Sequence, residues 1–126
     1  MDVEMRIVLV VESDILIRSP LSEYLRECGY HVLEASGATE ARQHVEAAAT
    51  SIDVILADAA GDGGFALATW VRTTYPGVAV ILAGSVDKAA EKAGDLCEQG
   101  PAIAKPYDHQ LVLDRIRQML ASRDRG

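Results

Sequence analysis

The hydrophobic pattern of this chain switches repeatedly between two periods, and this alternation limits the possible folds more than any other feature. It begins with a continuous apolar run rich in β-branched residues, Met5–Val11 (MRIVLVV), which predicts a strand buried on both faces. Apolar residues then recur at helical spacing from Ile17 to Cys28, and Gly29 is predicted to end this helix. A strand followed directly by an amphipathic helix is the repeating unit of α/β proteins.

The same strand–helix unit recurs four more times along the chain. Further strands are predicted at Tyr30–Ala35, Asp53–Ala57, Val78–Ala83 and Ala102–Ala104. Further helices are predicted at Phe65–Thr74, Asp87–Gln99 and Asp108–Ser122, and another follows Ser36 and carries Ala38, Ala41, Val45 and Ala48. Alternation of this kind predicts a parallel sheet with helices on both faces. Because 126 residues suit one such domain, residues 1–126 are expected to form a single α/β domain with no second domain attached.

Two residues bear on where the first two helices begin. Pro20 interrupts the first helical pattern, because proline cannot donate a backbone hydrogen bond to the Leu16 carbonyl. The first helix is therefore either kinked at Pro20 or begins at Ser19, with Pro20 in its first position. Ser36 precedes the second helix and is expected to cap its N-terminus through the side-chain hydroxyl.

Charge and hydropathy argue against several classes of partner. The formal net charge is −7 and the pI is near 4.8, and a surface of that sign repels phosphate backbones, so no direct nucleic-acid binding is expected. No apolar run is long enough to span a bilayer, and Met1–Glu4 lacks the basic and apolar regions of a signal peptide. We therefore expect a cytoplasmic protein that makes no membrane contact.

The two cysteines, Cys28 and Cys97, lie far apart in the sequence and have neither metal-ligand nor redox spacing. Each falls on a predicted helix beside apolar residues. The expectation is that both are small buried hydrophobic residues and that they do not form a disulfide.

Polar residues gather where the predicted strands end. They are Glu12, Ser13 and Asp14 after the first strand, Asp58 after the third, Gly84 and Ser85 after the fourth, and Lys105 after the fifth. In an open parallel sheet the binding site forms at the carboxyl ends of the strands, where the strand order reverses, and in the order 2-1-3-4-5 the first and third strands are neighbours there. Carboxylates would then meet a lysine. Crowded carboxylates need a counter-charge such as Mg²⁺, and a carboxylate beside a metal and a lysine suits phosphoryl transfer onto that carboxylate.

Four segments resemble the receiver domains of bacterial two-component response regulators, in the same order and spacing. They are Val8–Arg18 (VLVVESDILIR), Asp53–Asp58 (DVILAD), Gly64–Arg72 (GFALATWVR) and Lys105–Tyr107 (KPY). The resemblance covers nearly the whole chain. It implies a CheY-like, flavodoxin-like (βα)5 fold with a doubly wound parallel sheet in the order 2-1-3-4-5, and a stand-alone role in phosphorelay signal transduction.

The resemblance also implies roles for individual residues. Asp58 matches the phosphoryl acceptor, which is served by a histidine kinase or a histidine phosphotransfer protein. Glu12, Asp58 and the backbone carbonyl of Ala60 match the Mg²⁺ site, and Lys105 matches the phosphate-binding lysine, followed by a cis bond to Pro106. Receivers are signalling proteins, so an enzyme is not expected. The fourth helix, fifth strand and fifth helix form the usual partner and homodimer face of the family.

Several positions depart from the family pattern. Ser13 replaces the acidic residue that is usually the main metal ligand, which predicts weak Mg²⁺ binding. Ser13 is expected to be a helix N-cap rather than a ligand, and Asp14 is the next candidate ligand in line. At the two switch positions, Gly84 replaces a Thr or Ser, with Ser85 one residue late, and Ala102 replaces an aromatic residue. The loop after the acceptor is also shorter than usual and rich in glycine.

Two functions from different classes remain open. In the first, the chain is a phospho-acceptor that works through Glu12, Asp58 and Lys105. In the second, it is a pseudo-receiver that acts as a protein-interaction module without any phosphate. A flavin-binding protein of related topology is a weaker third reading, because the acidic strand ends disfavour the flavin phosphate.

Overall fold

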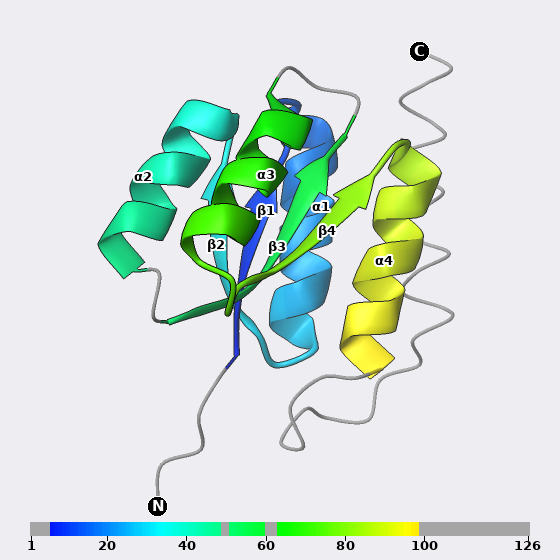
Figure 1. Cartoon of the computed structure of the whole chain (residues 1–126). Coiled ribbons are helices and arrows are strands. Elements are labelled where there is room, and N and C mark those ends of the chain that lie inside the picture. The colour runs from blue at the N-terminus through cyan, green and yellow to red at the C-terminus, as the bar shows by residue number, and fades with distance from the viewer. Residues whose placement is uncertain (1–5, 49–50, 60–62, 99–126) are drawn as a thin grey trace, which may run out of the picture.

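The computed structural model describes residues 6–48, 51–59 and 63–98. Within these ranges the chain forms a parallel sheet in the order β2-β1-β3-β4 (Figure 1). The strands are β1 (Ile7–Val11), β2 (His31–Ala35), β3 (Ile52–Asp58) and β4 (Ala79–Ala83). The predicted α/β class with a parallel sheet is confirmed, and so is the order of the first four strands. The predicted fifth strand and last helix lie outside the described residues.

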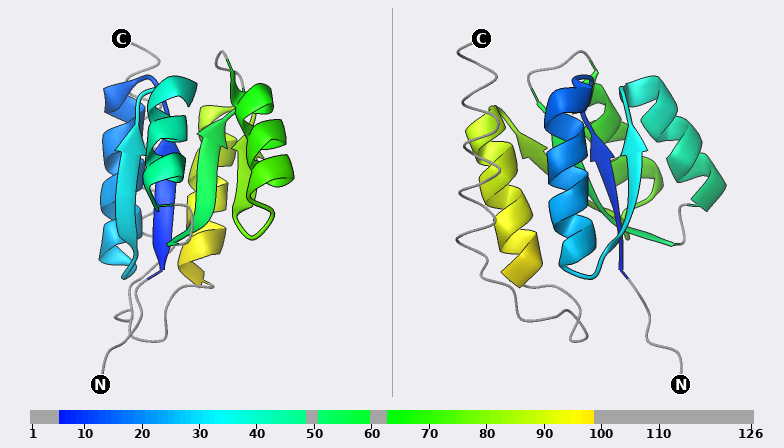
Figure 2. Two further views of the ribbon diagram at one scale, coloured as in Figure 1. Left: turned by 60° about the vertical axis from the view of Figure 1, so that its left-hand side comes forward. Right: turned by 180° about the vertical axis from the view of Figure 1, so that it is seen from behind.

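Helices cover both faces of this sheet, as the alternating pattern predicts. They are α1 (Ile15–Glu27), α2 (Ala38–Ala48), α3 (Gly64–Thr74) and α4 (Val86–Glu98). Figure 2 shows α1 and α4 together on one face and α2 and α3 on the other, in agreement with the helix–helix contacts. In the described ranges, no helix combines the length and the apolar character that crossing a membrane requires.

Strand β1 lies inside the sheet with helices on both faces, and this position explains why its sequence is apolar at every residue. Alternate side chains of a strand point to opposite faces of the sheet. Val8 and Val10 pack into the core beneath α1 and α4, whereas Leu9 and Val11 pack into the core beneath α2 and α3. Because both faces are covered, all four side chains are buried.

Helix α1 continues through Pro20, which lies inside the helix rather than in its first position. Asp14 is its N-cap, and one carboxylate oxygen accepts a hydrogen bond from the Leu16 N–H at 2.9 Å. The expectation that Ser13 caps this helix is therefore wrong by one residue. A start at Ser19 is also wrong, because the helix begins at Ile15. The helix ends at Glu27, and Gly29 stops it as predicted, because Gly29 has φ 100°, a left-handed conformation that glycine adopts without strain.

The start of α2 also differs from the expectation by one residue. The Gly37 carbonyl accepts the first helical hydrogen bond, from the Ala41 N–H at 3.0 Å, which puts Gly37 rather than Ser36 in the capping position. Ser36 instead donates its backbone N–H to the Glu40 carboxylate at 2.7 Å. Glu40, in the first turn of α2, thus accepts the hydrogen bond of the Ser36 N–H, which lies just before the helix.

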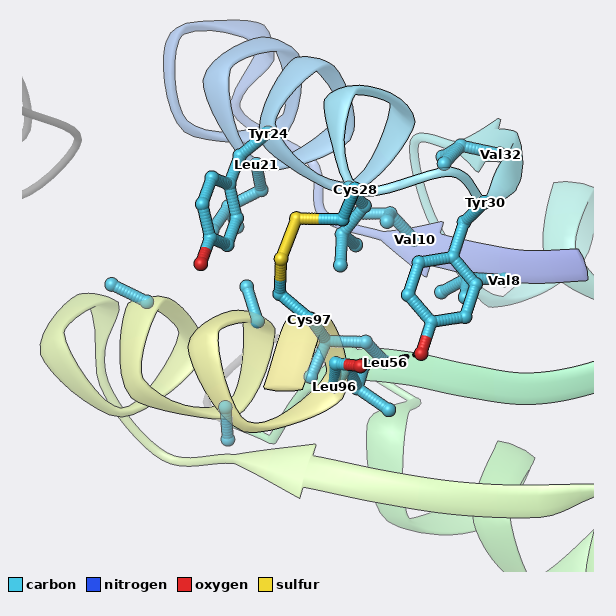
Figure 3. Close-up of a cluster of buried hydrophobic side chains, with 14 of the residues drawn as sticks. Val8, Val10, Leu21, Tyr24, Cys28, Tyr30, Val32, Leu56, Leu96 and Cys97 are labelled. Carbon is cyan, nitrogen blue, oxygen red and sulfur yellow. Dashed lines mark hydrogen bonds between the residues drawn. A yellow bond between two sulfur atoms is a disulfide. The ribbon is translucent and has the colours of Figure 1, made fainter. Parts of the chain in front are cut away.

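The two cysteines form a disulfide, and the expectation that they stay unpaired is wrong (Figure 3). Their burial is as expected, with Cys28 1% and Cys97 4% exposed. The pairing arises because α1 and α4 lie side by side on one face, so that their C-terminal ends meet across 69 residues of sequence, with the Cα atoms 5.5 Å apart. Tyr30 adds a second link, since its hydroxyl donates a hydrogen bond of 2.5 Å to the Leu96 carbonyl.

Candidate functional site

The strand order brings two carboxylates from distant parts of the chain to one end of the sheet. β1 and β3 are neighbours, and Val11 lies opposite Ala57, so the next residues, Glu12 and Asp58, emerge together. This is the point where the strand order reverses, and it is where open parallel sheets form their sites. Both residues are half-buried.

Backbone hydrogen bonds hold both carboxylate-bearing segments to the neighbouring strand. The Glu12 N–H donates to the Ala35 carbonyl at 3.0 Å, at the end of β2. The Ala59 N–H donates to the Ala83 carbonyl at 2.9 Å, at the end of β4. The site therefore extends across the ends of all four described strands.

Glu12 and Asp58 lie between two cavities, one on each face of the sheet. The cavity on the side of α1 and α4 has a volume of about 280 Å³ and is largely apolar, with Ile17, Leu21 and Ala89 in its wall. The cavity on the side of α2 and α3 has a volume of about 300 Å³ and is more polar. It is lined in part by Ser13, Ser36, Gly37 and Gly64. A small group can thus approach the two carboxylates from either side.

The environment of Glu12 disfavours its charged form. Burial raises the pKa of Glu12 above its usual value of 4.5, and a hydrogen bond from the Asp14 N–H, at 2.9 Å, opposes that rise. The negative charges of Asp58 and then Asp14 raise the pKa further. Repulsion between carboxylates of this kind is relieved when a cation binds between them.

Ser13 and Asp14, which follow Glu12, use their side chains in contacts within the loop and are therefore less available as metal ligands. Asp14 uses a carboxylate oxygen to cap α1, and the exposed Ser13 points its hydroxyl to the Glu12 carboxylate at 3.5 Å. Among the described residues no group of three or more His, Cys, Asp or Glu could hold a metal. Glu12 and Asp58 nevertheless fit Mg²⁺ as a pair, because this ion is usually held by one or two protein carboxylates and keeps several waters. Ala60, the expected carbonyl ligand, lies outside the described residues.

Arg18 fixes the loop that carries Glu12. Its Nη1 donates to the Glu12 carbonyl at 2.8 Å, and its Nε donates to the Glu34 carboxylate on β2 at 3.1 Å. The same carboxylate accepts a hydrogen bond from Arg26 at 3.0 Å. Hydrophobic periodicity does not identify Arg18. One signal in the sequence is its spacing of four residues from Asp14, which puts both on one side of the helix, next to the loop.

Gly64 lets the start of α3 approach the candidate acceptor. A Cβ atom at this position would lie 2.5 Å from the Asp58 backbone carbonyl oxygen, a distance that no side chain tolerates. Gly63 precedes it with φ 85°, in the left-handed region. The glycine-rich turn is visible in the sequence, but the need for glycine at position 64 follows from the close approach of two backbone segments.

The positions expected to report phosphorylation are only partly described. A Cβ atom added at the exposed Gly84 would meet nothing within 4 Å, so a residue larger than glycine fits the backbone here. Ser85 lines the apolar cavity, but its hydroxyl accepts a hydrogen bond from the Lys88 N–H at 3.1 Å and so caps α4. Lys105, its bond to Pro106, and Ala102 lie outside the described residues.

The chain is similar in sequence to a bacterial regulatory protein. No family model matches the chain. The transcriptional regulatory protein GltR of Pseudomonas aeruginosa is 30% identical over 121 residues, which cover 91% of this chain and 49% of GltR. The chain therefore spans about half the length of this relative.

Solved receiver domains match the structure over most of the chain. The NtrC4 receiver domain, solved in solution as a beryllofluoride-activated dimer, is 30% identical with a TM-score of 0.56 and covers 94% of this chain and 98% of its own. The chemotaxis response regulator CheY4 of Vibrio cholerae is 26% identical with a TM-score of 0.59, over 91% and 98% of the two chains. A receiver domain protein from Clostridium thermocellum is 24% identical with a TM-score of 0.61, over 95% and 98%.

Proposed function

The chain belongs to the response regulator receiver domains, and from this membership we propose that Asp58 accepts a phosphoryl group from a histidine kinase or a histidine phosphotransfer protein. The observation that carries the proposal is the meeting of Asp58 with Glu12 at the switch point of the sheet, with a cavity on either side. A role in two-component signalling follows, as for the receiver domains that this chain resembles.

In the proposed reaction the Asp58 carboxylate attacks the phosphorus atom of a phosphohistidine. A bond forms between an Asp58 oxygen and phosphorus, the nitrogen–phosphorus bond breaks, and the imidazole leaves with its electron pair. Glu12 and Asp58 would hold Mg²⁺, which when bound neutralises negative charge around the phosphoryl group. The resemblance assigns Lys105 a matching role as a positive charge on the phosphoryl oxygens.

Exposed apolar side chains near the acceptor support a protein as the phosphoryl donor. Ile15 and Leu16 at the start of α1 are 53% and 60% exposed, and Phe65 at the start of α3 is 68% exposed. Both helices begin at the end of the sheet that carries Asp58 (Figure 1). A contiguous patch of exposed apolar groups commonly marks a docking site for another protein, and these three side chains are the candidates for such a patch.

A second candidate is a pseudo-receiver that binds a partner without being phosphorylated. Two observations favour it. Asp14 is engaged in capping α1, and Ser85 is engaged in capping α4, so neither replaces the ligand and the hydroxyl that the family pattern would supply. The described residues also lack a cluster of three potential metal ligands.

The remaining properties that we propose are those typical of receivers. They are a single domain over residues 1–126, a cytoplasmic location, and no direct contact with nucleic acid or membrane, in line with the net charge of −7. A homodimer would use α4 together with the fifth strand and fifth helix. The similar NtrC4 receiver domain was itself solved as a dimer.

Beryllofluoride with Mg²⁺, which mimics an acyl phosphate, separates the two candidate functions. Amide NMR shifts would be recorded on the wild-type chain and on Asp58→Ala. A phospho-receiver shows shifts around Asp58 that extend to α4 and are absent in the variant. If the amide shifts of the wild-type chain do not change even at high Mg²⁺, the result contradicts phosphoryl acceptance and favours the pseudo-receiver.

A further inference from the structure

We propose that Arg18 is a positioning residue that holds Glu12 beside Asp58 and so sets the affinity of the site for Mg²⁺. The inference rests on the proposed function of Asp58. Arg18 touches neither Asp58 nor the space for a phosphoryl group in any described contact, and it acts through the backbone of the loop between β1 and α1.

The guanidinium of Arg18 is fixed from two sides. Its Nη1 donates to the Glu12 carbonyl at 2.8 Å, and its Nε donates to the Glu34 carboxylate at 3.1 Å. Its side chain is only 16% exposed. A planar guanidinium held by two acceptors loses most of its freedom, so it can serve as a rigid strut between β2 and the loop.

With this contact, both backbone groups of Glu12 are bound. The N–H donates to Ala35 at the end of β2, and the carbonyl accepts from Arg18. The direction in which the Glu12 side chain leaves the backbone is thereby set. Such a restraint matters here because the Glu12 carboxylate lies near the carboxylates of Asp58 and Asp14, and like charges repel one another.

Arg26 provides a matched control on the same helix. It donates to the same Glu34 carboxylate at 3.0 Å and to the Val32 carbonyl at 3.1 Å. Arg18→Ala and Arg26→Ala therefore each remove one cation from Glu34. Only the Arg18 variant releases the Glu12 carbonyl.

The test measures Mg²⁺ affinity from amide shifts around Asp58, together with urea unfolding and hydrogen exchange of the Glu12 N–H. Arg18→Ala is expected to weaken Mg²⁺ binding about tenfold or more, as is typical when the partner of a metal ligand is removed. It should also speed exchange of the Glu12 N–H. Arg26→Ala should leave both unchanged, and urea unfolding shows how much stability each variant loses. Arg18→Lys, which can reach one acceptor but not both, should restore part of the affinity.

Equal Mg²⁺ affinities for the two alanine variants would overturn the proposal. If the wild-type chain itself binds neither Mg²⁺ nor beryllofluoride, the proposed phosphoryl acceptance fails. The hold of Arg18 on Glu12 is then judged by exchange of the Glu12 N–H alone. Unchanged exchange in Arg18→Ala would overturn that hold as well.

Discussion

The two ends of helix α1 are built from different interactions. At its N-terminal end, hydrogen bonds and charges organise the loop that carries Glu12, through the Asp14 cap and the Arg18 contact. At its C-terminal end, Cys28 is buried and covalently joined to Cys97 on α4. At the polar end, neighbouring carboxylates repel one another. At the buried end, a disulfide and the Tyr30 hydrogen bond join α1 and the residues after it to α4. We infer that stability and chemistry are separated along one helix, which the following variants test.

The largest expected effect is on the buried end. For Cys97→Ser, loss of a disulfide that spans 69 residues should lower the free energy of unfolding by about 4 kcal/mol under oxidising conditions. Urea unfolding measures this difference. Under a dithiol reductant the two proteins should differ far less, and beryllofluoride shifts around Asp58 should remain. A thiol count of two in the untreated wild-type protein would contradict the disulfide.

A smaller effect is expected where α3 approaches Asp58. In Gly64→Ala, the added methyl would lie 2.5 Å from the Asp58 carbonyl oxygen, so the backbone must shift, at a cost of about 1–3 kcal/mol. This variant should disturb both stability and the response to beryllofluoride. Gly77→Ala is the control, because an added Cβ there meets nothing within 4 Å. If the two variants unfold alike, the close approach at Gly64 is not tight.

The smallest effect is expected at Glu12, and its sign depends on pH. Because the pKa of Glu12 is raised in the folded protein, its ionised form opposes folding at neutral pH. Glu12→Gln should therefore be slightly more stable at pH 7, by under about 1 kcal/mol for a half-buried group. The gain in stability should vanish as the pH falls below the ordinary pKa of 4.5, where Glu12 is protonated in both the folded and the unfolded protein.

Unfolding as a function of pH measures this gain. Glu46→Gln, on the exposed side of α2, controls for the loss of one negative charge. A Glu12→Gln variant that is less stable at pH 7 would mean that ionised Glu12 stabilises this end of the molecule. The contrast between the two ends of α1 would then be weaker than the structure indicates.

Element positions follow from local patterns, and the sequence predicts them closely. The apolar run at Met5–Val11 becomes β1 at Ile7–Val11, and the helix predicted at Asp87–Gln99 becomes α4 at Val86–Glu98. Helix starts are harder, because several residues compete for one cap. Ser13 and Asp14 can both accept a hydrogen bond from the first turn, and only the backbone path shows that Asp14 does so.

By itself, the sequence determined the alternation of strands and helices, the parallel sheet, and the placement of Glu12 and Asp58 at strand ends. These depend on periods and neighbours that a short window contains. The tertiary structure decided the pairing of Cys28 with Cys97, the strut from Arg18, and the need for glycine at position 64. Each of these depends on how far apart two separate segments lie once the helices have packed, and no local pattern encodes that distance.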